Sequence, residues 1–560
     1  MADTAPTFDL AFVMAGAVSA GAYTGGVMDF LFEALEEWEK EKERNRWQHG
    51  DDFSKWDVPY HNINIKALAG ASAGGMTSAM TAASIAQPVN HVRTKADIVP
   101  GLKNKFFNSW VNQIDIRDLT QTEDLKKDPK LKSILDSTKI MSIAAQALGN
   151  MDGNINRPYF SKSVQLFVTV SNLRGIPYQI KFNSTDKSNL VIIQHGDYFH
   201  FEISRDGAQR FNSALFISLK NPNPEVIEIL KNAGAATGAF PFGLAPVTLS
   251  RKASEYGTRF NLLSERHIAP AWPTENFDSA KYDFIFETID GGLINNEPLE
   301  LARVALLPIE LKNDPNIPDA QKRNPREAKN VRASVIMIDP FPSDFVFQTD
   351  YNPNKFMRAL IGDVLGTLRH QAMFKTSELI DAVNESVFSR FLIAPTRSED
   401  QKHPIACGAL GGFAGFLCED FRMHDYFLGR RNAQRFFSKY FALPAEDAFQ
   451  NDIFKNQRTQ YTKYLKNDNP DSIPIIPLLG SAAMEAQAID WPQGKIDLED
   501  VMNHFDSRIS AVTSNLISEF TSNYFQRKAL QFALSAYGNK RIHDFIKKTI
   551  AKEMDDFKLS

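Results

Sequence analysis

The sequence predicts an α/β fold, with a mostly parallel central sheet flanked by helices and a mainly helical C-terminal region. Three observations predict it. Short apolar runs suited to buried strands alternate with segments whose apolar residues recur at helical spacing. Two of these runs end at glycine-rich turns that lead into helices, and from Phe356 onward the pattern becomes mainly helical. Strands alternating with helices form parallel sheets covered on both faces. We therefore expect one domain over residues 1–345 and a helical region over residues 346–560.

The first half of the chain supplies the strands of the predicted sheet. Residues 8–14 form an apolar run, and the helix expected after the next glycine-rich stretch ends in the charged residues 39–44. A second strand is expected at residues 63–68. A helix of mainly small residues follows it at 74–86, suited to close packing against a sheet. Further strands are expected at residues 164–170, 178–182, 284–289 and 331–338.

The second half is dominated by helical spacing, as at residues 357–368, and ends in an interrupted helix over about residues 511–551. Strand fragments are expected there at residues 391–394 and 473–479. Phenylalanine occurs 42 times in the chain, and ten of these residues lie between Phe391 and Phe454. We expect this concentration to form the core of the C-terminal region or its seam with the first domain. A surface that faces lipid is the alternative.

Composition and charge exclude several classes of protein. The 560 residues include 63 Lys and Arg against 67 Asp and Glu, a net charge of −4, whereas nucleic-acid-binding proteins usually have a clustered basic excess. The two cysteines, Cys407 and Cys418, have neither disulfide-framework nor zinc-ligand spacing. No apolar run approaches the about 20 residues that cross a bilayer, and no secretory signal is visible. We expect a soluble, cytoplasmic protein, peripheral to the membrane at most, with its oligomeric state left open.

The pattern Gly70-Ala71-Ser72-Ala73-Gly74 is the sharpest local signal for chemistry. It follows a predicted strand and opens a predicted helix, the context in which a G-x-S-x-G serine is a nucleophile. The tight turn strains the serine, Gly70 and Gly74 let the backbones approach, and the helix N-terminus favours an oxyanion. The structural alternative is a glycine-rich turn that merely packs well.

The loop from Gly16 to Gly26 lies between the first strand and the first helix. Its glycines leave backbone N–H groups free to face a ligand, as an oxyanion hole requires. A nucleotide-binding turn is the weaker interpretation, because neither G-x-G-x-x-G nor a following Gly-Lys-Ser/Thr is present.

Asp290, Gly291 and Gly292 directly follow the predicted strand at residues 284–289. Open α/β sheets place their sites at the carboxyl ends of strands. Taken alone, an Asp-Gly pair is as well explained by an ordinary turn.

Together these three elements, in this order, resemble the patatin-like phospholipases. That family has a glycine-rich oxyanion loop near its N-terminus, then G-x-S-x-G, then a late Asp-Gly-Gly/Ala. Residues 290–298 (DGGLINNEP) are similar to the family's D-G-G-x-x-x-N-x-P, and residues 236–242 (ATGAFPF) to its A-S-x-A-x-P block. Residues 168–175 fall where the family has a strand and a turn. The resemblance covers about residues 8–340.

The resemblance implies a patatin-like fold and a lipid acyl hydrolase. Ser72 would attack a carboxylic ester of a phospholipid or related lipid, and Asp290 would act as its base without a histidine. Backbone N–H groups of Gly16, Ala17 and Val18 would hold the oxyanion. No metal or cofactor is implied, and the partner would be a lipid substrate at a membrane surface.

One departure from the family pattern concerns the oxyanion loop. The family usually has three consecutive glycines and then an arginine before the next glycine, whereas this chain has Gly16-Ala17-Val18 and Ala20. Alanine and valine do not readily adopt positive φ, so a loop that needs such angles would be altered here.

Two alternatives to the Ser–Asp mechanism remain open from the sequence. One is an α/β-hydrolase esterase whose triad includes a late histidine, for which the candidates are His370, His403, His424, His504 and His543. The other is a weakly active patatin-fold protein that serves as a binding or scaffold module.

Overall fold

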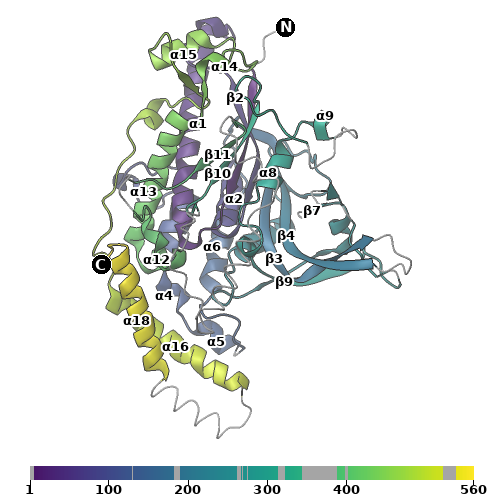
Figure 1. Ribbon diagram of the computed structural model, residues 1–560, viewed down its shortest axis with the longest axis vertical. Helices are drawn as coiled ribbons and strands as arrows, with labels where there is room; N and C mark the ends of the chain where they lie inside the picture. Colours follow the sequence, from purple (N-terminus) through teal and green to yellow (C-terminus); the bar gives the residue numbers. More distant parts are fainter. Residues whose placement is uncertain are drawn as a thin grey trace, which may run out of the picture.

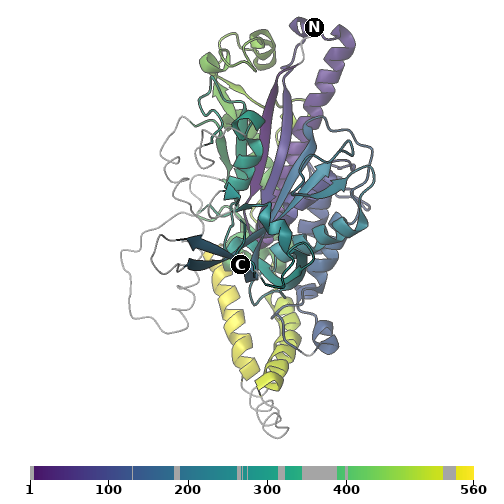
Figure 2. The same cartoon turned by 90° about the vertical axis from the view of Figure 1, so that its right-hand side faces the viewer.

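In the part of the chain that the structure describes, a nine-stranded sheet runs through the middle of the molecule, with helices on both of its faces (Figures 1 and 2). The computed structural model describes residues 5–128, 130–181, 189–261, 266–267, 269–273, 275–312, 322–342, 387–397, 402–520 and 538–560. The main path of the sheet is β11–β10–β1–β2–β3–β4–β5, while β9 pairs with β3, and β6 with β9. These strands are β1 (Thr7–Met14), β2 (Asn62–Gly70), β3 (Phe160–Lys181), β4 (Asn189–Ser204), β5 (Leu215–Ser218), β6 (Val247–Lys252), β9 (Asp283–Asp290), β10 (Ala333–Ile338) and β11 (Arg390–Ile393).

The predicted mostly parallel sheet is confirmed. All neighbours from β11 to β3 are parallel, as are β4 and β5, while β9 is antiparallel to β3 and β6, and β4 to β3. Side chains of β1 alternate between two cores, because successive residues of a strand point to opposite faces. Phe8, Leu10 and Phe12 enter the larger core, and Ala11 and Val13 enter the smaller one. Burial on both faces explains why this strand reads as an apolar run.

Helices cover both faces of the sheet. On the side of the larger core lie α1 (Gly21–His49), α2 (Ser72–Ser84) and α7 (Pro224–Thr237), and on the other side lies α8 (Leu299–Leu306). Other elements of the described ranges are α3 (Lys105–Phe107), α4 (Ile116–Leu119), α5 (Glu123–Lys127), α6 (Thr138–Leu148), α9 (Ile309–Lys312), α12 (Ala414–Leu417), α13 (Glu419–Arg435), α14 (Ala445–Ala448), α15 (Arg458–Leu465), α16 (Leu498–Phe520) and α18 (Asn539–Asp556), with the short strands β7 (Phe260–Asn261), β8 (Arg266–His267), β12 (Ala442–Pro444) and β13 (Ser472–Pro474). None of the helices in these ranges is both long and apolar enough to span a membrane.

Two predicted strand assignments were wrong. The segment 164–170 and the described part of the segment 178–182, residues 178–181, belong to one long strand, β3, which carries an irregularity between Ser171 and Ile176 where Gly175 has φ 76°. Of residues 473–479, only Ile473 and Pro474 are in a strand, the short β13, which pairs with β12 outside the central sheet. Pro474 and Pro477 lack the N–H groups that would continue a ladder.

Two predicted helix boundaries were also wrong. The first helix does not end in the charged run 39–44 but continues to His49, because acidic and basic side chains three residues apart pair along it, as Lys42 does with Glu39. The final helix is α16 followed by α18, which extend from one end of the molecule (Figure 1). The predicted helix at residues 357–368 and the boundary after residue 345 lie outside the described residues, so the two-domain division remains a prediction.

The C-terminal half is packed directly onto the first half. β11 extends the central sheet beside β10, and α13 lies along α1 (Figure 1). Two glycines permit this close approach. A Cβ at Gly26 would lie 1.9 Å from the carbonyl oxygen of Tyr426, and one at Gly429 would lie 2.1 Å from that of Tyr23.

Part of the phenylalanine concentration forms a seam between the two halves. The ring of Phe441 lies 6.2 Å from that of Phe8 on β1 and 4.9 Å from that of Phe391 on β11, in edge-to-face geometry. Phe454 also contacts Phe8, at 6.3 Å. Aromatic pairs at these separations bury large apolar areas. These rings form the seam that the composition predicted.

A buried ionic network joins α1 to α13 and to the loop around residue 91. Arg430 donates hydrogen bonds to the carboxylates of Asp29 and Glu33, and His91 contacts Asp29 at 2.8 Å and Glu36 at 3.2 Å. Burial alone would lower the pKa of His91, but its hydrogen bonds to the two carboxylates outweigh burial and raise the pKa from 6.5 to about 9. The histidine is therefore protonated at neutral pH and takes part as a cation.

We expect His91 to make the stability of the protein depend on pH. Because its pKa is raised in the folded state, its contribution is complete below about pH 6.5 and is lost as pH rises through about 9. The expected loss is on the order of 3 kcal/mol. Thermal unfolding midpoints between pH 6.5 and 9 should therefore fall more steeply for wild type than for His91→Gln. The variant His504→Gln, which replaces a half-buried histidine outside this network, should follow wild type. Parallel curves for wild type and His91→Gln would contradict the prediction.

Candidate active site

Ser72 lies in the sharp turn between β2 and α2. Its φ is 51°, so the strained conformation predicted from the sequence is present. A Cβ at Gly70 would lie 2.5 Å from the carbonyl oxygen of Gly74, and one at Gly74 would lie 2.0 Å from that of Met14. No side chain fits at either glycine without moving the backbone. The Ser72 N–H donates to Thr237 Oγ1 at 2.8 Å, which anchors the turn to the end of α7.

Asp290 ends β9 and lies directly against Ser72. Ser72 Oγ donates a hydrogen bond to Asp290 Oδ2 at 2.6 Å, and the Gly292 N–H donates to Asp290 Oδ1 at 2.7 Å. Each of the two residues is only 6% exposed. A Cβ at Gly291 would lie 2.2 Å from the Thr169 carbonyl oxygen, and one at Gly292 would lie 2.5 Å from Asn296 Oδ1. These glycines let the turn after β9 close tightly and hold the carboxylate in place.

The glycine loop passes immediately beside the serine. A Cβ at Gly16 would lie 2.9 Å from Ser72 Cβ and 2.4 Å from Asn296 Oδ1, so this position also requires glycine. Within the part of the chain that the structure describes, the backbone N–H groups of Gly16, Ala17 and Val18 donate to no protein acceptor. The loop therefore offers free donors at the site.

Val18 adopts φ 49°, whereas Ala17 has φ −148°. Val18 therefore adopts the positive φ that valine does not readily take, and Ala17 does not. The loop keeps a left-handed residue despite lacking a glycine there, which means that neighbouring groups must hold it.

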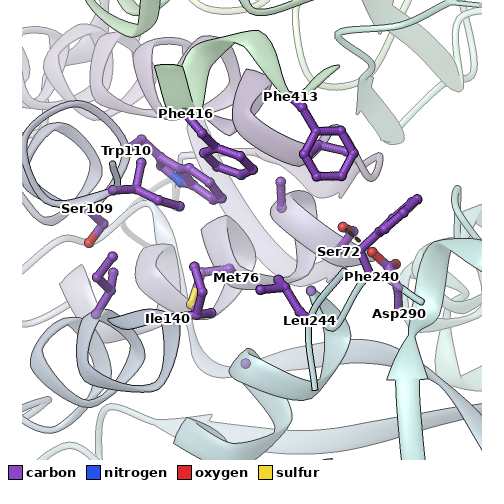
Figure 3. A pocket seen from close by; sticks show the side chains of 16 residues that line it. Ser72, Met76, Ser109, Trp110, Ile140, Phe240, Leu244, Asp290, Phe413 and Phe416 are labelled. Atoms are coloured by element: carbon purple, nitrogen blue, oxygen red, sulfur yellow. Dashed lines mark hydrogen bonds between the residues drawn. The ribbon is translucent and has the colours of Figure 1, made fainter. Parts of the chain in front are cut away.

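An apolar slot leads away from the Ser72–Asp290 pair (Figure 3). Its empty volume is about 630 Å³, its open mouth included. Met76 of α2 lies one turn beyond the serine, and Trp110 borders the slot further along, its indole N–H bonded to Thr77 Oγ1 at 3.0 Å. The remaining lining residues are mostly apolar: Val18, Ala73, Ser109, Ile114, Ile140, Ile143, Gly234, Gly238, Phe240, Leu244, Phe413 and Phe416.

Phe413 and Phe416 bring the C-terminal half into the site, which the sequence interpretation missed. The Phe413 ring lies 5.2 Å from that of Phe240 and 5.8 Å from that of Phe416, so the three rings border the slot together (Figure 3). Both residues belong to the phenylalanine-rich stretch, but nothing in their spacing distinguishes a pocket wall from a core. Phe240 lies in the segment similar to the family's A-S-x-A-x-P block, which was the available signal.

The four candidate triad histidines that the structure describes lie away from the slot. No histidine lines the slot within the described ranges. His424 is buried against Asp425 and Trp491, and His403 stacks on Phe557. His504 and His543 lie beside Asp500 and Asp506. His370 lies outside the described residues.

The part of the chain that the structure describes shows no cluster of side chains that could bind a metal ion. There, no group of three or more His, Cys, Asp or Glu residues lies close enough to hold a metal ion. Cys407 and Cys418 are both buried and unbridged.

The protein has an α/β fold. At a strand–helix turn of this fold, the hydroxyl of Ser72 donates a hydrogen bond to the carboxylate of Asp290. The family model for patatin-like phospholipases matches residues 12–303, just over half of the chain. The chain belongs to this family, as its motifs predicted, and membership implies lipid acyl hydrolase activity.

The chain was also compared with individual proteins. "Uncharacterized protein y4iI" of Sinorhizobium fredii (strain NBRC 101917 / NGR234) is 32% identical, over 98% of this chain and 82% of that protein. This likeness extends through the C-terminal half, which the family model does not cover. The crystal structure of VipD from Legionella pneumophila matches with 11% identity and a TM-score of 0.20, over 100% of this chain and 92% of that one. A similarity that low carries no argument about fold or function.

Proposed function

We propose that this protein is a serine lipid acyl hydrolase that cleaves carboxylic ester bonds of phospholipids or related lipids through a Ser72–Asp290 dyad. The observation that carries the proposal is the 2.6 Å hydrogen bond from Ser72 Oγ to Asp290 Oδ2 at the end of an apolar slot. A nucleophile within hydrogen-bond reach of its base is the arrangement that covalent catalysis requires.

In the proposed reaction, Ser72 Oγ attacks the ester carbonyl carbon while Asp290 takes the hydroxyl proton. The negative charge that develops on the carbonyl oxygen is stabilised by free N–H groups of Gly16, Ala17 and Val18, and by the N-terminus of α2. Asp290 then gives its proton to the leaving alkoxide, which departs as an alcohol and leaves an acyl group on Ser72. Water, deprotonated by Asp290, releases that acyl group as a carboxylic acid and restores the serine.

The lining of the slot favours a lipid acyl chain as the part of the substrate that enters it. Among the lining residues that the structure describes, apolar side chains dominate, and hydroxyl or carboxylate groups come from Ser72, Ser109 and Asp290. Phe242, 76% exposed, lies two residues from Phe240 of the lining and would contact the apolar part of a lipid surface. We therefore propose that the substrate is taken from a membrane or micelle, with the protein peripheral to that surface in the cytoplasm.

The decisive experiment measures hydrolysis of a panel of lipid esters, with fluorophosphonate labelling of the folded protein. Wild type should release fatty acid and be labelled at Ser72, and Ser72→Ala should do neither. Ser84→Ala is the matched control, because it removes a buried hydroxyl at the far end of the same helix. Folded wild-type protein that hydrolyses no ester and takes no label would instead support the binding or scaffold alternative.

Phe416 should influence which acyl chains are accepted. Phe416→Leu is expected to widen the slot near Trp110 (Figure 3) and to raise kcat/KM for long-chain relative to short-chain p-nitrophenyl esters by about tenfold. Phe427→Leu is the control, because Phe427 is buried but does not line the slot. A chain-length profile unchanged from wild type would show that the substrate does not reach Phe416.

A further inference from the structure

Val18 combines a strained backbone with a position in the active site. It is β-branched, it has φ 49°, and it lines the slot beside Ser72 and Asp290. A residue of this kind leaves the left-handed region unless its surroundings hold it there. The groups that hold Val18 therefore determine where the neighbouring N–H groups point.

The next residue, Ser19, supplies such a connection. Its side chain is fully buried, and its hydroxyl donates to the carbonyl oxygen of Gly412 and accepts from the N–H of Gly415 at 3.0 Å. Both partners lie in the segment 406–417, made of the turn η8 (Ala406–Gly412), Phe413 and α12 (Ala414–Leu417). Ser19 thus bonds the glycine loop to the C-terminal half of the chain.

Gly412 and Gly415 can lie this close to Val18 and Ser19 because they have no side chains. A Cβ at Gly415 would lie 2.5 Å from Ser19 Oγ and 2.9 Å from Ser19 Cβ. Gly412 has φ 98°, and a Cβ there would lie 3.2 Å from Val18 Cβ. The backbone of the segment 406–417 therefore lies directly against both Val18 and Ser19.

The segment 406–417 is itself anchored at several points. The Asp425 carboxylate of α13 accepts hydrogen bonds from the N–H groups of Ala406 and Cys407, each at 2.8 Å. Arg422 of the same helix donates to the carbonyl oxygens of Gly415 at 2.5 Å and Val111 at 2.9 Å. The segment can therefore serve as a fixed support for the loop.

We propose that Ser19 is a positioning residue for the oxyanion hole. Through Gly412 and Gly415 it holds Val18 in the left-handed conformation that directs the N–H groups of the loop toward the ester oxygen. The C-terminal half thus supplies the support that lets valine occupy a position where the family usually has glycine. This inference rests on the proposed function.

The test compares wild type with Ser19→Ala, using a soluble p-nitrophenyl ester and a trifluoromethyl ketone, which forms an anionic tetrahedral adduct with an active serine. We expect kcat to fall about 10- to 100-fold, less than the 10²–10³-fold loss caused by removing an oxyanion donor outright. KM should change less than threefold, within about the uncertainty of such comparisons. The affinity for the ketone should fall by the same factor as kcat, because both depend on stabilising an oxyanion.

Ser84→Ala is the matched control, because it removes a buried hydroxyl that bonds only within α2, and it should keep wild-type kcat. If Ser19→Ala does not fold, Ser19→Cys is the second variant, because it keeps a weak donor on a somewhat larger side chain, and it should show the same split between kcat and KM. Wild-type kcat and ketone affinity in the Ser19 variant would overturn the inference, as would a loss confined to KM. Wild-type protein that is inactive and unlabelled at Ser72 would overturn the proposed function, and the inference with it.

Discussion

Replacing Asp290 by asparagine is expected to lower kcat for ester hydrolysis by about 10⁴-fold while leaving the fold intact. The asparagine amide is nearly isosteric with the carboxylate, and its oxygen can still accept from the Gly292 N–H. The amide cannot, however, take the proton of the Ser72 hydroxyl. In wild type this hydroxyl lies 2.6 Å from Asp290 Oδ2. Steady-state kinetics on a lipid ester, with thermal unfolding to check the fold, would measure both effects.

Asp283→Asn provides the control for this experiment. Asp283 begins the same strand and pairs with Lys252 at the surface, 2.9 Å away, so the variant makes the same chemical change away from the slot. Wild-type activity in Asp290→Asn would eliminate the aspartate as the base. His370, the one triad candidate outside the described residues, should then be replaced next.

The second large effect is expected on stability. Gly26→Ala would place a Cβ 1.9 Å from the Tyr426 carbonyl oxygen, which is far inside van der Waals contact. The atom in the way belongs to the backbone of α13 and not to a movable side chain. The two helices must separate, so we expect a loss of about 3 kcal/mol, the upper end of the range for overpacked cores, or failure to fold.

Gly25→Ala is the matched control on the same helix. A Cβ at Gly25 would lie 3.3 Å from Trp110 and 3.4 Å from Phe106, and alanine favours the helix by about 1 kcal/mol. This variant should therefore remain close to wild type. Thermal unfolding of the two variants gives the comparison, and equal midpoints would show that α13 does not press on α1 as closely as the structure indicates.

Much of the fold could be predicted from local sequence. The parallel core was recognisable because residues 10–14 of β1 and 67–70 of β2 are buried on both faces and are continuously apolar. The full length of β3 was not recognisable, because Gly175 suggests a break between two strands. In the structure, β4 pairs with β3 on both sides of the irregularity that contains this glycine. The charged end of α1 was misjudged because ion pairs along the helix, such as Lys42 with Glu39, extend it where apolar periodicity stops.

The family, the fold class and the residues proposed as nucleophile and base all follow from the amino-acid sequence. Ser72 and Asp290 could be recognised because each needs glycines at particular neighbouring positions, where any side chain would collide with backbone or buried polar atoms. Tertiary structure alone decided how the rest of the site is made. Phe413 and Phe416 border the acyl slot, and Ser19 bonds to a segment almost 400 residues away. Contacts between such distant segments depend on how the packed elements meet, and no local pattern records that.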